Sequence, residues 1–161
     1  RWRGWKTLAW GVLGVSLFLA VTFLVVKVVG SPSFPYSQGI ALTLPRDLPL
    51  VLLLVALWLV TTLGEEIMFR GYMQTGLTER YGLAVGLLLP ALLWALRHHP
   101  ADLYWGWGAP MAQWLSRLGQ LYLGALIVGL ERHWSKSTAA TWITHLLLWL
   151  VVIINAIGTG G

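Results

Sequence analysis

An uncharged apolar run, residues 48–64, leads directly into the acidic pair Glu65-Glu66, and Arg70 follows one helical turn later. Residues 48–76 therefore predict a helix that crosses a membrane, which needs about 20 mainly apolar residues. Each charge carried into lipid costs about 2.5–3.5 kcal/mol on insertion scales. A chain that keeps two adjacent carboxylates there usually needs them, so we interpret this region as the outline of a polar site inside a membrane protein.

The composition agrees with a membrane class. Hydrophobic residues make up 57% of the chain and charged residues only 11%, whereas a soluble domain has about 25% charged residues. The apolar runs predict five membrane helices, over residues 7–29, 48–76, 82–99, 118–132 and 138–157. We therefore expect an all-α, polytopic integral membrane bundle in a bacterial cell membrane, in contact with lipid. The net charge of +5 comes without any basic run, so no nucleic-acid partner is expected.

Loops are expected at residues 30–47 and 100–110, with a short polar turn at 78–82. Gly119, Gly124 and Gly129 interrupt the fourth run. His133, beside Glu131 and Arg132 in a short loop, is expected to be solvated. Ser135 to Thr138 predicts the N-terminal cap of the last helix. More basic residues lie near the helix ends on the N-terminal side than on the opposite side, which has Lys27, Arg46, Arg97 and Arg117. This excess weakly favours a cytoplasmic N-terminus. This organisation divides the chain into a first helix with its loop, 1–47, and a main membrane domain, 48–157.

The acidic pair predicts a division of labour between its two members. Glu66 and Arg70 are i,i+4 neighbours on one face of a helix, with the acid first, which is the favoured order. Glu65 points about 100° away and is left as a free carboxylate, suited to general-base work on water. The alternative is a purely structural Glu-Arg pair, with Glu65 reaching toward water at the membrane surface.

Two histidines lie on later apolar runs. His98 ends the run VGLLLPALLWALRHH, and His145 sits in TWITHLLLWLVVII, far from any charged residue. Both are candidates for a polar site shared with Glu65, although a buried histidine is often only a hydrogen-bonded core residue. His99 precedes Pro100, which biases it out of the helix, and we expect it to be an interfacial residue.

The segments GEEIMFRGYMQ, LLWALRHHP and TWITH together resemble the CAAX-protease and bacteriocin-processing (CPBP) family of intramembrane proteases. That family carries EExxxR, FxxxH and Hxxx(N/D) on successive membrane helices. Glu65, Glu66 and Arg70 match the first motif. Trp94 and His98 match the second, with Trp in place of the usual Phe. His145 matches the third, but Trp149 stands where Asn or Asp is expected.

The resemblance implies an endopeptidase that cleaves peptide bonds of a peptide or membrane-protein substrate. Carried over by position, Glu65 would activate water together with His98, and His145 would polarise the scissile carbonyl. Glu66, Arg70 and Trp94 would support the site. The cofactor stays open between none and zinc, because Glu65, His98 and His145 also form the two-histidine, one-glutamate set of many catalytic zinc sites.

Trp149 motivates a different reading of the function. An indole cannot replace a carboxamide, and losing one oxyanion donor costs about 10²–10³ in rate. The chain could therefore be a non-catalytic scaffold or immunity-type member of the same family. A proton-coupled transporter is a further alternative, because intramembrane Glu and His also build proton relays. Five helices without a detectable repeat are few for a transporter.

Overall fold

The computed structural model describes residues 4–29, 48–98 and 111–158, all of which lie in helices or their short connections. The elements are α1 (Gly4–Val29), α2 (Leu48–Glu66), the π-helix η2 (Ile67–Met73), α3 (Gln74–Tyr81), α4 (Leu83–Arg97), α6 (Met111–Ser135) and α7 (Thr138–Gly158). Because α2, η2 and α3 run on without a break, the described residues form five helices, each where one was predicted. The all-α class is confirmed.

Two of the predicted boundaries were wrong. The polar segment 78–82 is not a turn, because residues up to Tyr81 belong to α3 and the chain reverses at Gly82 alone. Gly82 has φ +87°, a conformation that only glycine adopts easily. The glycines of the fourth helix do not interrupt it, and α6 continues through residues 131–133, which were read as a loop. The loops predicted at 30–47 and 100–110 lie outside the described residues.

The cap predicted before the last helix is confirmed. The Ser137 hydroxyl accepts a hydrogen bond from the Ala140 backbone N–H at 3.2 Å, the contact that satisfies one of the unpaired amides at a helix start. Lys136, just before it, has φ 55°. This tight connection holds α6 and α7 as neighbours.

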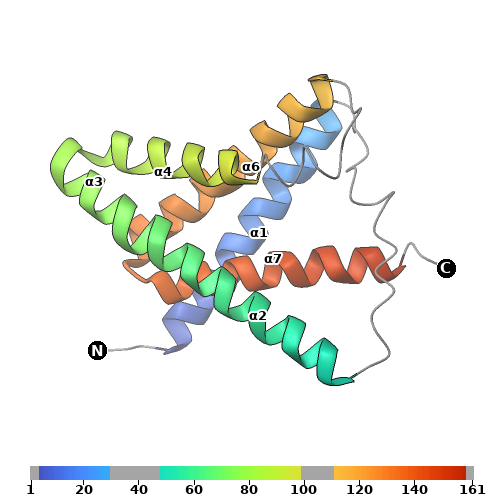
Figure 1. Cartoon of the computed structure of the whole chain (residues 1–161). Helices are drawn as coiled ribbons and strands as arrows, with labels where there is room; N and C mark the ends of the chain where they lie inside the picture. The colour runs from blue at the N-terminus through green and yellow to red at the C-terminus, as the bar shows by residue number, and fades with distance from the viewer. Residues whose placement is uncertain (1–3, 30–47, 99–110, 159–161) are drawn as a thin grey trace.

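Figure 1 shows α2, η2 and α3 as one long helix, from whose end α4 turns back so that the two diverge like the arms of a V. α4 packs on α6, and α2 packs on α7. α1 lies against α7 and α6. α1 can come this close because Gly14 has no side chain. A side chain at this position would collide with Glu131 and Thr144. The Thr144 Oγ also lies 3.0 Å from the Gly11 carbonyl oxygen.

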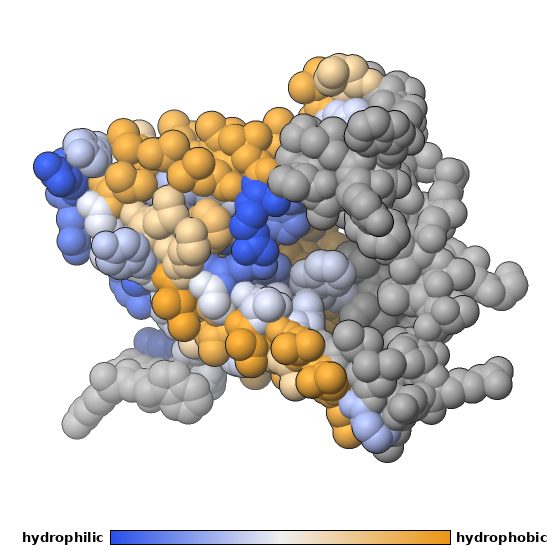
Figure 2. All heavy atoms as spheres, viewed as in Figure 1, coloured by the Kyte–Doolittle hydropathy of each residue, from blue (hydrophilic) through white to orange (hydrophobic). Residues whose placement is uncertain are grey.

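The described interior contains many polar side chains, and large hydrophobic side chains lie on the outer surface. Glu66, Thr141 and Thr144 are the largest fully buried side chains. Exposed leucines line α4, namely Leu88, Leu89, Leu92, Leu93 and Leu96. Figure 2 shows this apolar surface over α4 and another over α2, with a hydrophilic band between them. Such an arrangement fits a protein whose outer surface faces lipid.

Length and composition alone identify one helix of the described residues that could cross a membrane, over Gly4–Leu24. Two shorter apolar helices cover Leu83–Arg97 and Thr138–Val151. The prediction that all five helices cross the membrane therefore stays a prediction at this point.

Candidate active site

The acidic pair lies where the long helix changes its winding. α2 ends at Glu66, and the next seven residues, Ile67–Met73, form a π-helix. π-helical segments are rare, and they occur frequently at functional sites. The following α3 is fixed separately, because the Gln74 side chain donates a hydrogen bond from Nε2 to the Gly129 carbonyl of α6 at 2.7 Å. The acids therefore sit at the junction of two helical segments.

Glu66 belongs to what we call the buried cluster: Glu66, Arg70 and His145. Glu66 is 1% exposed, and its Oε1 lies 3.4 Å from an Arg70 guanidinium nitrogen. The predicted Glu66–Arg70 pair is confirmed. His145 Nδ1 lies 3.0 Å from the same oxygen. A carboxylate oxygen only accepts hydrogen bonds, so Nδ1–H of His145 is the donor. Nε2 of His145 is not used in this contact.

Glu65 belongs to a second group, the outer cluster: Glu65, Trp94, Arg97 and His98. The Trp94 indole Nε1–H donates to Glu65 Oε2 at 2.9 Å. The Arg97 guanidinium donates to the other oxygen, Oε1. The Glu65 side chain is 10% exposed, whereas that of Arg97 is 50% exposed. Each oxygen of this carboxylate thus has a different partner, one inside the protein and one at its surface.

His98 packs against Trp94, the residue that binds Glu65, with a defined orientation. Its Nδ1 is 2.9 Å from the Trp94 carbonyl oxygen, so this nitrogen carries the proton and donates it. In the neutral ring, Nε2 then has the free lone pair and can accept a proton. This is the tautomer that a proton-transferring histidine next to a carboxylate requires.

Trp94 joins the two clusters. Its ring lies 4.3 Å from the His98 ring and 5.8 Å from the His145 ring, centroid to centroid. The Arg70 guanidinium lies 5.1 Å from the same indole, within the range of a cation–π interaction. The three candidate residues Glu65, His98 and His145 are therefore brought together around a single side chain that was predicted only as support.

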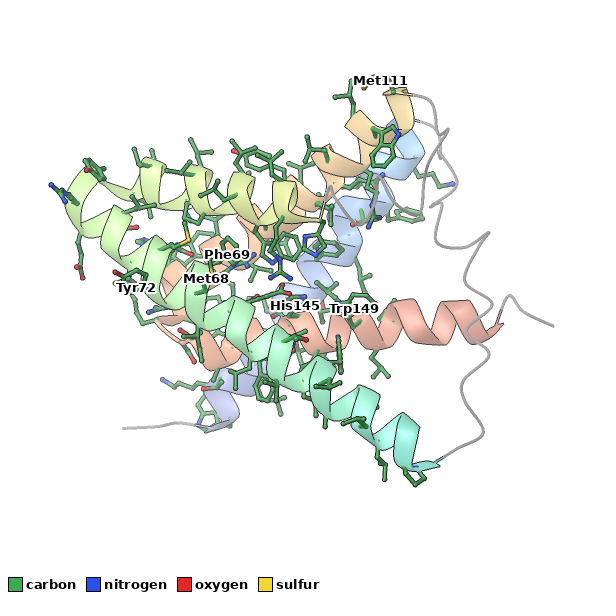
Figure 3. All side chains as sticks on the ribbon, in the orientation of Figure 1. Met68, Phe69, Tyr72, Met111, His145 and Trp149 are labelled. Carbon is green, nitrogen blue, oxygen red and sulfur yellow. The ribbon has the colours of Figure 1, made fainter. Side chains whose placement is uncertain are left out.

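Trp149 does not take the place of a carboxamide in this site. Its ring packs edge-on against Trp58 of α2, with centroids 6.3 Å apart, and the side chain is 40% exposed. Figure 3 shows His145 and Trp149 in succession along α7. Trp149 thus ties α7 to α2 one turn beyond the histidine.

In the described part of the chain, no three His, Asp or Glu side chains converge closely enough to hold a metal ion. Glu65 is bound by the cation Arg97. Each histidine uses Nδ1 in a hydrogen bond, which leaves Nε2 of both rings available for a proton or a metal ion. A mechanism with zinc and one with side chains alone therefore both stay predictions.

Two residues of the site region were missed by sequence reasoning. Arg97 was read only as a charge near a helix end, although its position three residues after Trp94 places both on one helix face. Glu131 was considered only as a neighbour of His133 in a short loop, but it is 3% exposed, and its Oε2 forms a hydrogen bond with the Thr144 hydroxyl at 2.7 Å. The sequence did contain a signal for Glu131. An acid directly after an apolar run lies close to the membrane interior, where a charge is costly, so it is expected to have a binding partner.

The family model of type II CAAX prenyl endopeptidase Rce1-like proteins matches residues 47–151. This match covers most of the chain, including α2 to α4, α6 and the part of α7 that carries His145 and Trp149. The chain belongs to this family. No similar protein was found among the curated proteins, and none was found among the solved structures.

Membership has direct consequences for class and function. Rce1-like proteins are membrane-embedded helical bundles, and the family supports a protease-type function with a peptide substrate. The resemblance noted in the sequence is thereby confirmed. α1 lies outside the matched range, and Gly11 and Gly14 allow it to pack against the matched helices.

Proposed function

We propose that this Rce1-like protein is an intramembrane endopeptidase that hydrolyses a peptide bond with a water molecule activated by Glu65. The observation that carries the proposal is the outer cluster, where a nearly buried carboxylate is held by the Trp94 indole beside His98. A carboxylate held in place at the edge of a membrane protein's interior is suited to take a proton from water. Membership in a family of endopeptidases supports the same reaction.

The proposed reaction uses the groups as follows. Water bound between Glu65 and the substrate attacks the carbonyl carbon while its proton passes to Glu65. His145, protonated on both nitrogens and stabilised as an imidazolium by Glu66 through Nδ1, donates a hydrogen bond from Nε2 to the oxygen that becomes negative. The proton held by Glu65, assisted by His98 Nε2, then moves to the amide nitrogen as the C–N bond breaks. The products are a carboxylic acid and an amine.

The buried cluster has a supporting role in this proposal. Arg70 neutralises Glu66, and Glu66 orients His145 through a 3.0 Å contact. A ring held in this way does not have to be reoriented when the transition state forms, which is the main source of electrostatic catalysis in enzymes. Arg70 also lies over Trp94, so it stabilises the residue that holds Glu65.

The first test compares purified wild-type protein with Glu65→Gln on quenched fluorescent peptides, in detergent and in liposomes. We expect the substitution to lower kcat by about 10²–10⁴-fold, the usual contribution of a general base. Glu79→Gln is the matched control, because Glu79 is an exposed acid of α3, and it is expected to keep wild-type activity. Glu65→Gln protein that cleaves at the wild-type rate would end the proposal.

The same assay examines the cofactor. Because the outer cluster places a cation rather than a metal-binding group against Glu65, wild-type cleavage is expected to survive prolonged treatment with a chelator. Activity that disappears with the chelator and returns with added zinc would contradict the side-chain mechanism and restore the zinc alternative.

The second candidate function is a non-catalytic scaffold. The Trp149–Trp58 contact favours it, because Trp149 joins α7 to α2 at a position where the motif expects Asn or Asp. Trp149→Asn separates the two candidates. If the protein is an enzyme that lacks one oxyanion donor, the introduced carboxamide is expected to raise kcat, by up to about 10². If wild type and Trp149→Asn both fail to cleave while remaining folded and the biological effect persists, the scaffold function replaces the protease.

The proposed site also requires the five helices to lie in a membrane. The chain contains no cysteine, so single cysteines introduced one at a time can report exposure to a water-soluble thiol reagent without background. Cysteines in the exposed leucine positions of α4 are expected to be protected in liposomes. A cysteine at Glu79 is expected to react from one side only.

A further inference from the structure

Glu131 is a buried acid that the proposed mechanism does not use. It belongs to α6 and lies at the seam where α1 packs against α6 and α7. A side chain added at Gly14 of α1 would collide with the Glu131 carboxyl group and with Thr144 of α7. Three helices therefore close around one carboxyl group, so its protonation state affects how they pack.

The Thr144 hydroxyl lies between two oxygen atoms. Its Oγ is 2.7 Å from Glu131 Oε2 and 3.0 Å from the Gly11 carbonyl oxygen of α1, and both distances are within the range of O–H···O hydrogen bonds. A hydroxyl has one hydrogen to donate, and a backbone carbonyl can only accept. Both contacts are hydrogen bonds at the same time only if Thr144 donates to Gly11 and a protonated Glu131 donates to Thr144.

The second oxygen of Glu131 also favours the neutral acid. Oε1 is buried and has no hydrogen-bond partner among the described residues. An ionised carboxylate here would be a buried charge with one unpaired oxygen, which costs far more than the same oxygen in a neutral carboxyl group. Glu66 and Arg70 act electrostatically on Glu131, but they already form an ion pair with each other. A charge on Glu131 would therefore be a second negative charge beside a balanced pair.

The helices packed around Glu131 bring no further cation to it. Residues 7–26 of α1 and 83–96 of α4 contain no charged residue and no histidine. α7 contains one titratable residue, His145, which is hydrogen-bonded to Glu66. On α6 itself, the next residue, Arg132, points about 100° away from Glu131. The neutral acid is thus the form that fits the seam from every side.

We propose that Glu131 is a proton-binding site at the seam of α1, α6 and α7, and that its bound proton holds α1 against the other helices. While Glu131 is neutral, two hydrogen bonds in series run from its carboxyl group through the Thr144 hydroxyl to the Gly11 carbonyl. This inference goes beyond the proposed function and does not depend on it.

Loss of the proton to water reverses one hydrogen bond and breaks the other. The Glu131 carboxylate takes the single hydrogen of the Thr144 hydroxyl, because a charged acceptor forms the stronger hydrogen bond. The Gly11 carbonyl then loses this donor. The seam also has to admit water to the new charge, since a buried carboxylate with one unpaired oxygen is costly. α1 is therefore held less tightly at high pH than at low pH.

The first measurement detects the proton itself. Infrared spectra of wild type and Glu131→Gln are recorded at about pH 6, where exposed carboxyl groups are ionised, in alkyl-maltoside micelles, which contain no carbonyl group. We expect wild type to show the C=O band of a protonated carboxyl group and Glu131→Gln to lack it. Glu79→Gln, which changes an exposed acid, is the matched control and is expected to keep the band. Glu131→Met is a second neutral variant, used if Glu131→Gln does not fold.

The second measurement follows α1. The chain contains no cysteine, so single cysteines can be placed at Val15, which is 9% exposed, and at Val12 of the same helix, which is 49% exposed. The rates of maleimide labelling are compared as the pH is raised, and their ratio corrects for the ionisation of the thiol. We expect the ratio of Val15→Cys to Val12→Cys to rise about two- to tenfold, the effect of losing one hydrogen bond on an opening equilibrium. In the Glu131→Gln background the ratio is expected to stay constant.

Each measurement has a result that would overturn part of the inference. A wild-type spectrum without the band, or a band that persists in the neutral variants of Glu131, would show that this residue does not hold the proton. A ratio of labelling rates that does not change with pH in wild type would show that the proton does not hold α1. An equal rise of the ratio in wild type and in Glu131→Gln would assign the pH dependence to another group.

Discussion

Glu65 and Glu66 are adjacent in the chain, yet they belong to opposite kinds of environment. Glu66 is 1% exposed and bound by Arg70 and His145, both of which are also buried. Glu65 is bound by one interior group and by one arginine that is half in solvent. Successive helix positions point about 100° apart, so one residue turns into the protein and the other toward its edge. A single pair of identical acids can thus supply a fixed support and an adjustable reactive group.

The two clusters should also differ in what they contribute to stability. Removing one partner of a buried ion pair leaves an uncompensated charge and costs about 3–5 kcal/mol. An exposed pair contributes only about 0–1 kcal/mol, and the half-exposed Arg97 lies close to that case. Substitutions in the buried cluster should therefore act mainly on folding, and substitutions in the outer cluster mainly on turnover.

The largest effect on stability is expected for Arg70→Ala. It leaves Glu66 buried without its cation, so the free energy of unfolding should fall by about 3–5 kcal/mol. Arg97→Ala, the matched change in the outer cluster, should lower it by less than about 1 kcal/mol. Denaturant unfolding in detergent micelles, followed by tryptophan fluorescence, measures both. Equal losses for the two variants would break the comparison between the clusters.

Trp94→Phe tests the group that joins the clusters. The ring and its contacts with the histidines are retained, but the hydrogen bond to Glu65 is lost, and hydrogen bonds to charged groups contribute about 1.5–3 kcal/mol. We expect kcat to fall by about tenfold or more with KM nearly unchanged, and the free energy of unfolding to fall by no more than about 1.5–3 kcal/mol. A variant with normal kcat would show that Trp94 only fills space, as the Phe usual at this position would.

The smallest effect is expected from Thr62→Val. The Thr62 hydroxyl accepts a hydrogen bond from the Trp142 indole at 3.1 Å, a contact between α2 and α7 about one turn before the acidic pair. Its loss should cost about 0.5–1.5 kcal/mol of stability and leave kcat unaltered. A large change in kcat would show that the reactive group depends on the whole α2–α7 contact rather than on the outer cluster.

Much of this architecture could be predicted from the sequence. Apolar runs located all five helices, the i,i+4 spacing predicted the Glu66–Arg70 pair, and the serine before Thr138 predicted the cap. The π-helix could not be predicted, because nothing in the periodicity of residues 67–73 marks one. Glu131 was misplaced because three consecutive charged or ionisable residues resemble a loop. Its partner, the Thr144 hydroxyl, lies on another helix and cannot be inferred from the local sequence.

The site was predicted in part. The motif spacing indicated which residues matter, but it could not indicate which acid contacts which histidine, since these contacts depend on the packing of three helices. His145 was expected to act beside Glu65, and the structure shows that it is hydrogen-bonded to Glu66. The contact of Arg97 with Glu65 depends on how closely α4 approaches α2, which a single sequence does not reveal.

The π-helix η2 has a consequence for how this protein can evolve. The acidic pair is fixed by its contacts with α4 and α7, while Gln74, directly after η2, is fixed to α6. If 67–73 became ordinary α-helix without a change in length, everything after it would rotate by about 100° relative to the acids. One of the two attachments would then be lost. Descendants of this chain can therefore replace the π-helix by α-helix only if they also delete about one residue from 67–73.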